Sequence, residues 1–191
     1  MKAAVVDGAL YLDERNWPDD GADTIVKDSQ PRDVAAALGV VANGAHEPAA
    51  LATQKRTALR AETELLYEAL AAHAPVSIPS QSFYFGPVYA AITKLRAANV
   101  SVRILVATRD ATARELPALK RLRDRGVDMR VTQSDEKMVF SGHASWISSA
   151  NATAGLEDTI DWGLRSRDAR FTQTLRQCFE ENWTRARPFG G

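Results

Sequence analysis

Short apolar runs bounded by turn residues dominate the first quarter of this chain, whereas longer stretches with helical spacing dominate the rest. The pattern of the first quarter predicts strands at residues 3–6, 9–12 and 24–26 and a helix at residues 31–41. Asp7-Gly8 is the expected turn between the first two strands. Pro31 is expected to open the helix, because proline is tolerated in a first helical turn. The part from Asn43 to about residue 52 follows neither pattern and is interpreted as a linker.

The rest of the chain alternates between helical and strand patterns. Helices are expected at 54–71, from Pro87 to Leu95, from Leu116 to Gly126 and over 171–183, and strands at 76–78, 100–106, 127–131, 136–140 and 144–147. The run 100–106 is almost continuously apolar, as strands buried on both faces of a parallel sheet are. This alternation predicts an α/β layered domain with a mostly parallel sheet.

Composition narrows the class of protein. The 191 residues include 24 basic and 24 acidic side chains, so no global field favours nucleic acid or an anionic membrane. No apolar run approaches the roughly 20 residues that span a bilayer, and the start does not read as a signal peptide, so we expect a cytoplasmic protein. Cys178 is the single cysteine, and the three histidines are scattered along the chain. These residues do not have the spacing of metal ligands, so neither a metal nor another cofactor is expected.

A stretch near the amino terminus is repeated later in the chain. Lys2 and Lys137 occupy equivalent positions, and so do Asn16 and Asn151, with an apolar run between each lysine and its asparagine. Such repetition indicates two copies of one structural unit. Because ammonium and amide groups are donors that phosphate oxygens accept from, the pattern predicts a phosphate site at a pseudo-twofold axis.

The spacing resembles that of the phospholipase D superfamily, whose members carry His-x-Lys-x4-Asp and then Gly-Ser-x-Asn in each of two halves. Asp7 stands at the aspartate position of the first copy, and Ser148-Ser149-Ala150-Asn151 is similar to the second element with serine in place of glycine. The resemblance implies a phospholipase D-like fold that hydrolyses or transfers a phosphodiester, such as a phospholipid, through a phosphohistidine and without metal. Residue by residue it implies a catalytic set, Lys2, Asp7, Asp135 and Lys137, and a substrate-binding set, Asn16, Ser149 and Asn151.

The chain departs from the family pattern at both histidine positions. The first would precede Met1, and Asp135 occupies the second. We therefore expect impaired turnover. Asp135 has two interpretations: a salt bridge to Lys137 in a site without chemistry, or an acid or nucleophile that Lys137 keeps ionised. The alternative functions are a catalytically silent phosphate-binding or scaffold module, and a purely structural domain.

The two halves are unequal in length. We interpret residues 53–191 as a complete second half and residues 1–52 as the remnant of a first half that lacks roughly 80 residues. Three explanations stay open: a fragment or misplaced start, completion by a second copy, or a dispensable layer. Because a truncated sheet exposes an edge, we expect either a homo-oligomer or a fragment of a longer chain.

Other residues near the motifs are less specific. Phe83, Tyr84 and Phe85 are expected where a strand ends, as an apolar wall, a stacking platform or core packing. The basic stretch 120–125 interleaves with leucines, as a solvated helix face does, so it gives no strong signal for a nucleic-acid partner. His143 is expected to be an exposed turn residue beyond the reach of Lys137.

Overall fold

The structure is a computed structural model that describes residues 3–13, 25–43, 51–52, 55–107, 115–152 and 160–190. Its strands are β1 (Ala3–Val6), β2 (Ala9–Asp13), β3 (Ile25–Asp28), β4 (Leu51–Ala52), β5 (Val76–Ser80), β6 (Val102–Ala107), β7 (Asp128–Thr132), β8 (Met138–Ser141), β9 (Ala144–Ser148), β10 (Gly163–Ser166) and β11 (Arg187–Pro188). Its helices are α1 (Pro31–Asn43), α2 (Lys55–Ala71), α3 (Pro87–Ala97), α4 (Leu116–Asp124) and α5 (Ala169–Arg185).

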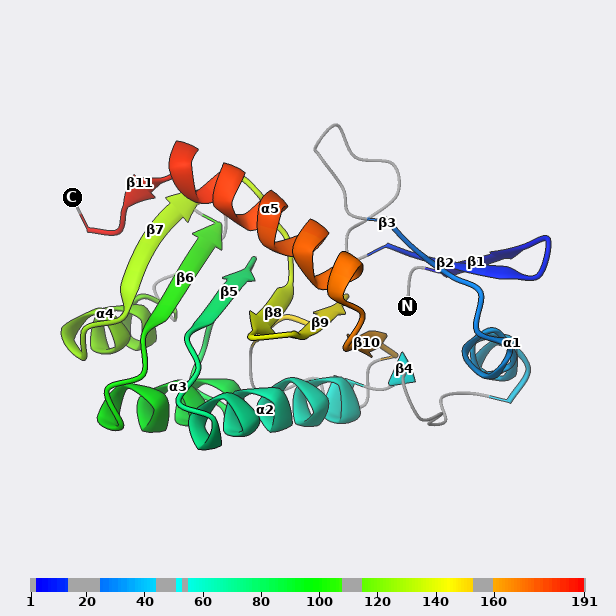
Figure 1. Ribbon diagram of the computed structural model, residues 1–191, viewed down its shortest axis with the longest axis horizontal. Helices are drawn as coiled ribbons and strands as arrows, with labels where there is room; N and C mark the ends of the chain where they lie inside the picture. Colours follow the sequence, from blue (N-terminus) through cyan, green and yellow to red (C-terminus); the bar gives the residue numbers. More distant parts are fainter. Residues whose placement is uncertain are drawn as a thin grey trace.

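These strands form a three-stranded sheet of order β1-β2-β3 and an eight-stranded sheet of order β11-β7-β6-β5-β8-β9-β10-β4 (Figure 1). The strands β5, β6 and β7 pair in parallel, and their neighbours toward both edges pair antiparallel. The predicted α/β layered architecture is confirmed, with a mixed sheet that is parallel at β5, β6 and β7. β4 and β11 were not predicted because two residues are too short for a recognisable pattern.

Helices cover both faces of the eight-stranded sheet. Figure 1 shows α2, α3 and α4 on one face and α5 on the other. Side chains alternate accordingly along the strands: Val139 belongs to the hydrophobic cluster with α2, α3 and α4, whereas Met138 and Phe140 belong to the cluster with α5. None of the helices in the described part of the chain is long and apolar enough to cross a membrane.

The repeat in the sequence is also a repeat in structure. In the first hairpin Ala3 pairs with Leu12, and in the second Met138 pairs with Ile147, which is the equivalent register. A third antiparallel strand follows in each copy, β3 or β10, and a helix follows that strand, α1 or α5. We call β1-β2-β3-α1 the first unit and β8-β9-β10-α5 the second unit.

Both hairpin turns use left-handed backbone conformations. The φ angles are 49° at Asp7, 73° at Gly8 and 57° at Gly142. Glycine adopts such angles without steric cost, and aspartate is among the residues that tolerate them best. The turn predicted from Asp7-Gly8 is therefore confirmed, and Gly142 supports the equivalent turn of the second hairpin.

Equivalent faces of the two units pack against each other. Leu12 and Val26 of the first unit share one hydrophobic cluster with Ile147 and Leu164, their counterparts in the second unit. Phe179 of α5 lies in the same cluster and is fully buried. The interpretation of residues 1–52 as the remnant of a truncated half stays a prediction.

Candidate phosphate site

Lys137 lies directly before β8 and is only 4% exposed. Its Nζ donates a hydrogen bond of 3.2 Å to the backbone carbonyl oxygen of Asp135. Its own carbonyl oxygen accepts a bond of 3.0 Å from the backbone N–H of Ser148, which extends the β8–β9 pairing. A buried ammonium is costly unless polar or anionic groups surround it, and the Asp135 carbonyl oxygen is one such group.

The segment after β9 is fixed by hydrogen bonds to the loop before β10. The Ser148 hydroxyl donates to the carbonyl oxygen of Trp162 at 2.5 Å and accepts from the N–H of Ala150 at 2.8 Å. The backbone N–H of Ser149 donates to the same carbonyl of Trp162 at 3.0 Å. The Ser148 side chain thus holds this segment in place.

Ser149 lies between two groups of that loop. Its hydroxyl donates to Oδ1 of Asp161 at 2.9 Å and accepts from the backbone N–H of Trp162 at 3.1 Å. A serine hydroxyl has one proton, and here that proton is donated to Asp161. Ser149 therefore positions the segment in this structure, and its predicted role as a phosphate ligand stays a prediction.

Asn151 is half-buried at the end of this segment, and its side-chain oxygen Oδ1 is buried without a hydrogen-bond partner among the described residues. The next residue, Ala152, forms a parallel bridge with Phe83 and accepts a bond of 3.2 Å from the N–H of Tyr84. Rotation of the amide by half a turn exchanges its oxygen and its NH₂ group. Asn151 can therefore present either a donor or an acceptor at this point.

The loop after β5 borders Asn151 and is held by Glu115. The Glu115 carboxylate accepts hydrogen bonds from the Ser82 hydroxyl and, at 3.2 Å, from the backbone N–H of Phe83. The Ser80 hydroxyl donates to the carbonyl oxygen of Ser82 at 2.9 Å. The sequence analysis missed Glu115, Ser82 and Asp161, because these contacts join residues far apart in the chain and leave no periodic signal.

The predicted aromatic wall divides into two parts. Phe83 is 1% exposed and belongs to the hydrophobic core, whereas Tyr84 and Phe85 are half-buried. The rings of Tyr84 and Phe85 lie 5.3 Å apart edge to face, and the Arg121 guanidinium lies 5.3 Å from the Phe85 ring centre. Only the second part is exposed enough to contact a ligand.

Four of the predicted site residues belong to the second copy and border the β8–β9 pair. Asp135 and Lys137 are buried, and Ser149 and Asn151 follow β9, the partner strand of β8. Lys2 and Asn16 lie outside the described residues. Asp7 is exposed at the β1–β2 turn, which in Figure 1 points away from the eight-stranded sheet, so it does not meet Lys137.

One hydrogen bond connects this site to the first unit. The indole Nε1 of Trp162 donates to the backbone carbonyl oxygen of Asp13 at 2.8 Å. Asp13 ends β2 and is the structural counterpart of Ser148, because each is the last residue of the middle strand of its unit. The ends of the two middle strands therefore meet at Trp162.

Metal ligands and histidine side chains are the remaining candidate chemical groups for this site. Among the described residues, no group of three His, Cys, Asp or Glu side chains could hold a metal ion. His143 is exposed in the β8–β9 turn, at the end of β8 opposite Lys137, as predicted.

Comparison with solved structures identifies proteins of the same fold. Nuc from Salmonella typhimurium, a phospholipase D family member, matches with a TM-score of 0.60 at 14% identity, over 69% of this chain and 91% of Nuc. NucT from Helicobacter pylori matches with a TM-score of 0.59 at 13% identity, over 71% of this chain and 92% of NucT. Polyphosphate kinase from Porphyromonas gingivalis matches with a TM-score of 0.64 at 14% identity, over 90% of this chain and 31% of the kinase. No family model and no curated protein sequence matches the chain.

Proposed function

For a chain with the fold of the phospholipase D family, we propose a phosphodiester-binding site in which Lys137 and Asn151 provide one half. Lys2 and Asn16, at the equivalent positions of the first copy, provide the other half. The ligand is a phosphodiester of small-molecule or phospholipid type. The protein is a phosphodiesterase-like hydrolase whose turnover is impaired.

The observation that carries this proposal is the pair of Lys137 and Asn151. Lys137 is 4% exposed, and the backbone of Ser148, three residues before Asn151, bonds to it directly. The Asn151 amide has a buried oxygen with no partner in the described part of the chain. Rotation of the Asn151 amide would turn its NH₂ group to this position, and an oxyanion could then accept from that group and from the Lys137 ammonium.

The register of the two hairpins supports a site shared by both copies. Because the hairpins pair identically and equivalent faces pack together, the last residues of β2 and β9 lie at equivalent positions of their units. The bond between Trp162 and Asp13 joins these two ends. Lys2 and Asn16 remain proposed members of the site on the grounds of their sequence positions, whereas Asp7, exposed at the β1–β2 turn, does not.

Asp135 is the reason for impaired turnover. It occupies the position at which the second motif has histidine, and it is 7% exposed and two residues from Lys137. A carboxylate there repels a phosphate anion and cannot form a phosphohistidine. Aspartate in place of histidine at position 135 favours the second candidate function, a silent module that binds phosphate without cleaving it.

Dimethyl phosphate, a small phosphodiester anion, is a direct probe of this site. It should raise the midpoint of thermal unfolding of the wild-type protein as its concentration rises, because a ligand that binds only the folded state stabilises that state. Lys137→Met retains the length of the side chain and should abolish the shift. Lys94→Met is the matched control, because Lys94 lies on α3 and contacts Tyr67. Equal shifts in both variants would contradict the proposal.

A further inference from the structure

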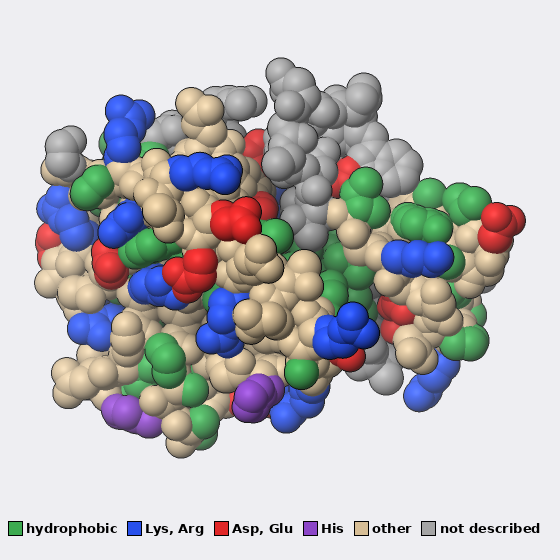
Figure 2. All heavy atoms as spheres, turned by 45° about the horizontal axis from the view of Figure 1, so that its top comes forward, with side chains coloured by type: hydrophobic (Ala, Val, Ile, Leu, Met, Phe, Trp, Pro, Cys, Tyr) green, Lys and Arg blue, Asp and Glu red, His purple; other side chains and the backbone are tan. Residues whose placement is uncertain are grey.

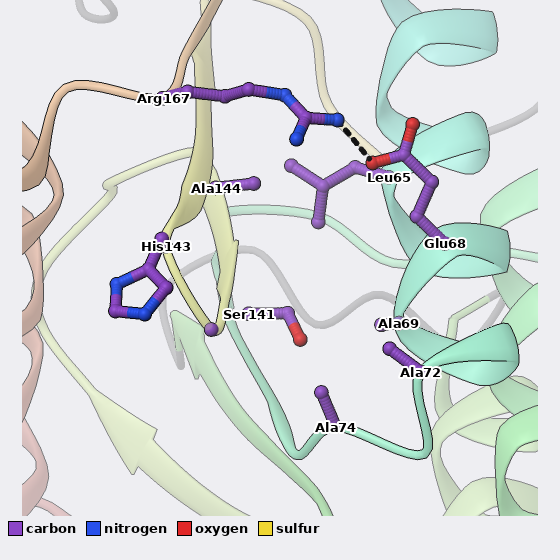
Figure 3. Close-up of a pocket in the computed structure, with 10 residues that line it drawn as sticks. Leu65, Glu68, Ala69, Ala72, Ala74, Ser141, His143, Ala144 and Arg167 are labelled. Atoms are coloured by element: carbon purple, nitrogen blue, oxygen red, sulfur yellow. Dashed lines mark hydrogen bonds and ion pairs between the residues drawn. The ribbon is translucent and has the colours of Figure 1, made fainter.

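A cavity lies at the end of β8 opposite Lys137. Its volume is about 300 Å³, and it is bordered by the last turns of α2, the residues leading into β5, the β8–β9 turn and Arg167 (Figure 3). Lys137 directly precedes β8 and Ser141 ends it, so about 13 Å of strand separates the cavity from the proposed phosphate site. The cavity is therefore a separate site.

The walls of this cavity are apolar and small. Its lining includes one leucine and four alanines, at positions 65, 69, 72, 74 and 144. These side chains offer methyl groups and no hydrogen-bonding atoms, so they suit the apolar body of a ligand. Alanine side chains also leave room for a flat ring.

Ser141 places one polar group in this apolar surface. Its side chain points into the cavity in Figure 3, beside Ala69, Ala72 and Ala74. Ser141 is 7% exposed, and its hydroxyl oxygen is buried without a hydrogen-bond partner in the described structure. A buried hydroxyl without a partner is unfavourable, and a polar group of a ligand would satisfy it.

Charged side chains lie at the other end of the cavity. Arg167 reaches across to the Glu68 carboxylate at 3.1 Å (Figure 3). Arg165 contacts the same carboxylate oxygen. The hydrogen bond from Arg165, with the positive charges of both arginines, holds the pKa of Glu68 below its ordinary value. Two guanidinium groups thus share one carboxylate, and the surplus positive charge favours an anion.

We propose that this cavity binds a small organic monoanion with a carboxylate at one end, an apolar ring in the middle and a hydroxyl group at the far end. The carboxylate contacts Arg167, the ring packs against the alanines, and the ligand hydroxyl pairs with Ser141. The volume lies at the lower end of the range for small-molecule pockets, about 300–1,000 Å³, which suits a single-ring ligand.

Three probes of similar shape separate the parts of this proposal, with calorimetry of the full chain as the measurement. 4-Hydroxyphenylacetate should bind, and phenylacetate should bind about three- to tenfold more weakly because it lacks the hydroxyl group. Tyramine, which carries a cation in place of the carboxylate, should bind more weakly than either anion. Absence of 4-hydroxyphenylacetate binding at millimolar concentration, or tyramine binding as tightly as the anions, would overturn the proposal.

Two variants assign the contacts. Ser141→Ala should remove the preference for 4-hydroxyphenylacetate over phenylacetate, and Arg167→Gln should weaken the binding of both anions and strengthen that of tyramine. Ser134→Ala is the matched control, because the Ser134 hydroxyl is also buried without a partner among the described residues but lies outside this cavity. An unchanged preference in Ser141→Ala, or an equal loss in Ser134→Ala, would show that Ser141 does not contact the ligand.

Discussion

Trp162 and Asp13 join the two structural units through a hydrogen bond of 2.8 Å between the indole Nε1 and a backbone carbonyl oxygen. Both residues are fully buried. Trp162 also holds Ser148 and Ser149 through its own backbone groups. One side chain therefore connects the loop of the proposed phosphate site to the end of β2 in the first unit.

The first prediction concerns this bond. Trp162→Phe should lower the free energy of unfolding by about 1–3 kcal/mol more than Trp146→Phe, as measured by urea denaturation. Both indoles are almost fully buried, but Nε1 of Trp146 has no hydrogen-bond partner in the described part of the chain. The control thus removes a similar ring without removing a bond. Equal losses in the two variants would mean that the bond contributes nothing.

The second prediction concerns Glu62, which is buried on α2 with one carboxylate oxygen lacking a partner among the described residues. Burial raises the pKa of Glu62 from 4.5 to about 8. The folded state therefore holds the proton more tightly than the unfolded state, and stability falls as the pH rises from about 4.5 to about 8. Glu62→Gln should remove this loss. The variant should raise the free energy of unfolding by on the order of 3–5 kcal/mol at pH 9 and change it little at pH 4.

Glu68→Gln is the control for that experiment. The hydrogen bond and charge of Arg165 lower the pKa of Glu68, so its carboxylate stabilises the fold above its unfolded pKa and the effect is lost as the pH falls. Denaturation at several pH values should therefore give opposite trends for the two variants. A pH-independent effect of Glu62→Gln would contradict the account of a buried, protonated carboxyl group.

The third prediction concerns self-association. Val6, Ile25 and Leu38 of the first unit are 52%, 57% and 52% exposed, and Figure 2 shows hydrophobic side chains grouped on that part of the surface. We expect the purified chain to be a dimer or larger in sedimentation equilibrium, because this surface and the open edge of β1 favour contact with a second copy.

The double variant Val6→Lys with Ile25→Lys should be a monomer, because the added charges oppose that contact. Tyr67→Lys is the control, since Tyr67 is 39% exposed but lies on α2 of the larger sheet. A wild-type protein that sediments as a monomer at micromolar concentration would rule out the prediction.

The fourth prediction concerns turnover. Protein of the printed sequence, without an expression tag, should release no product from bis-p-nitrophenyl phosphate above background. Asp135→His should not restore activity, because nucleophile and acid are two separate groups and each contributes, with acid–base catalysis alone worth about 10²–10⁴-fold. A tag ending in His-Met is to be avoided, since it would add a histidine at the motif spacing before Lys2. Clear turnover that Asp135→Asn abolishes would establish Asp135 as the acid or nucleophile.

The repeat is the part of the fold that could be predicted most specifically. Equivalent positions of Lys2 and Lys137 indicated two similar hairpins, and Asp7-Gly8 located the first turn, because turn residues and apolar runs act locally. The register, which pairs Ala3 with Leu12 in one hairpin as Met138 with Ile147 in the other, follows from those turns.

The remaining features of the fold and of the proposed site depend on contacts between distant parts of the chain. β10 was not predicted, because Gly163–Ser166 has only one large apolar residue and becomes a strand by pairing with β9. The bonds from Trp162 to Asp13 and from Ser82 to Glu115 join separate elements and have no local pattern. The sequence motif located Lys137 and Asn151, but the groups that hold their surroundings required the structure.

A crystal structure of the chain with bound tungstate tests the central claim most directly, because the metal's anomalous signal locates this phosphate-like anion without ambiguity. The account predicts one tungstate that contacts Lys137 and Asn151 from the second copy and Lys2 and Asn16 from the first. Tungstate bound elsewhere, or Lys2 and Lys137 pointing to opposite faces of the molecule, would contradict a phosphodiester site shared by the two copies.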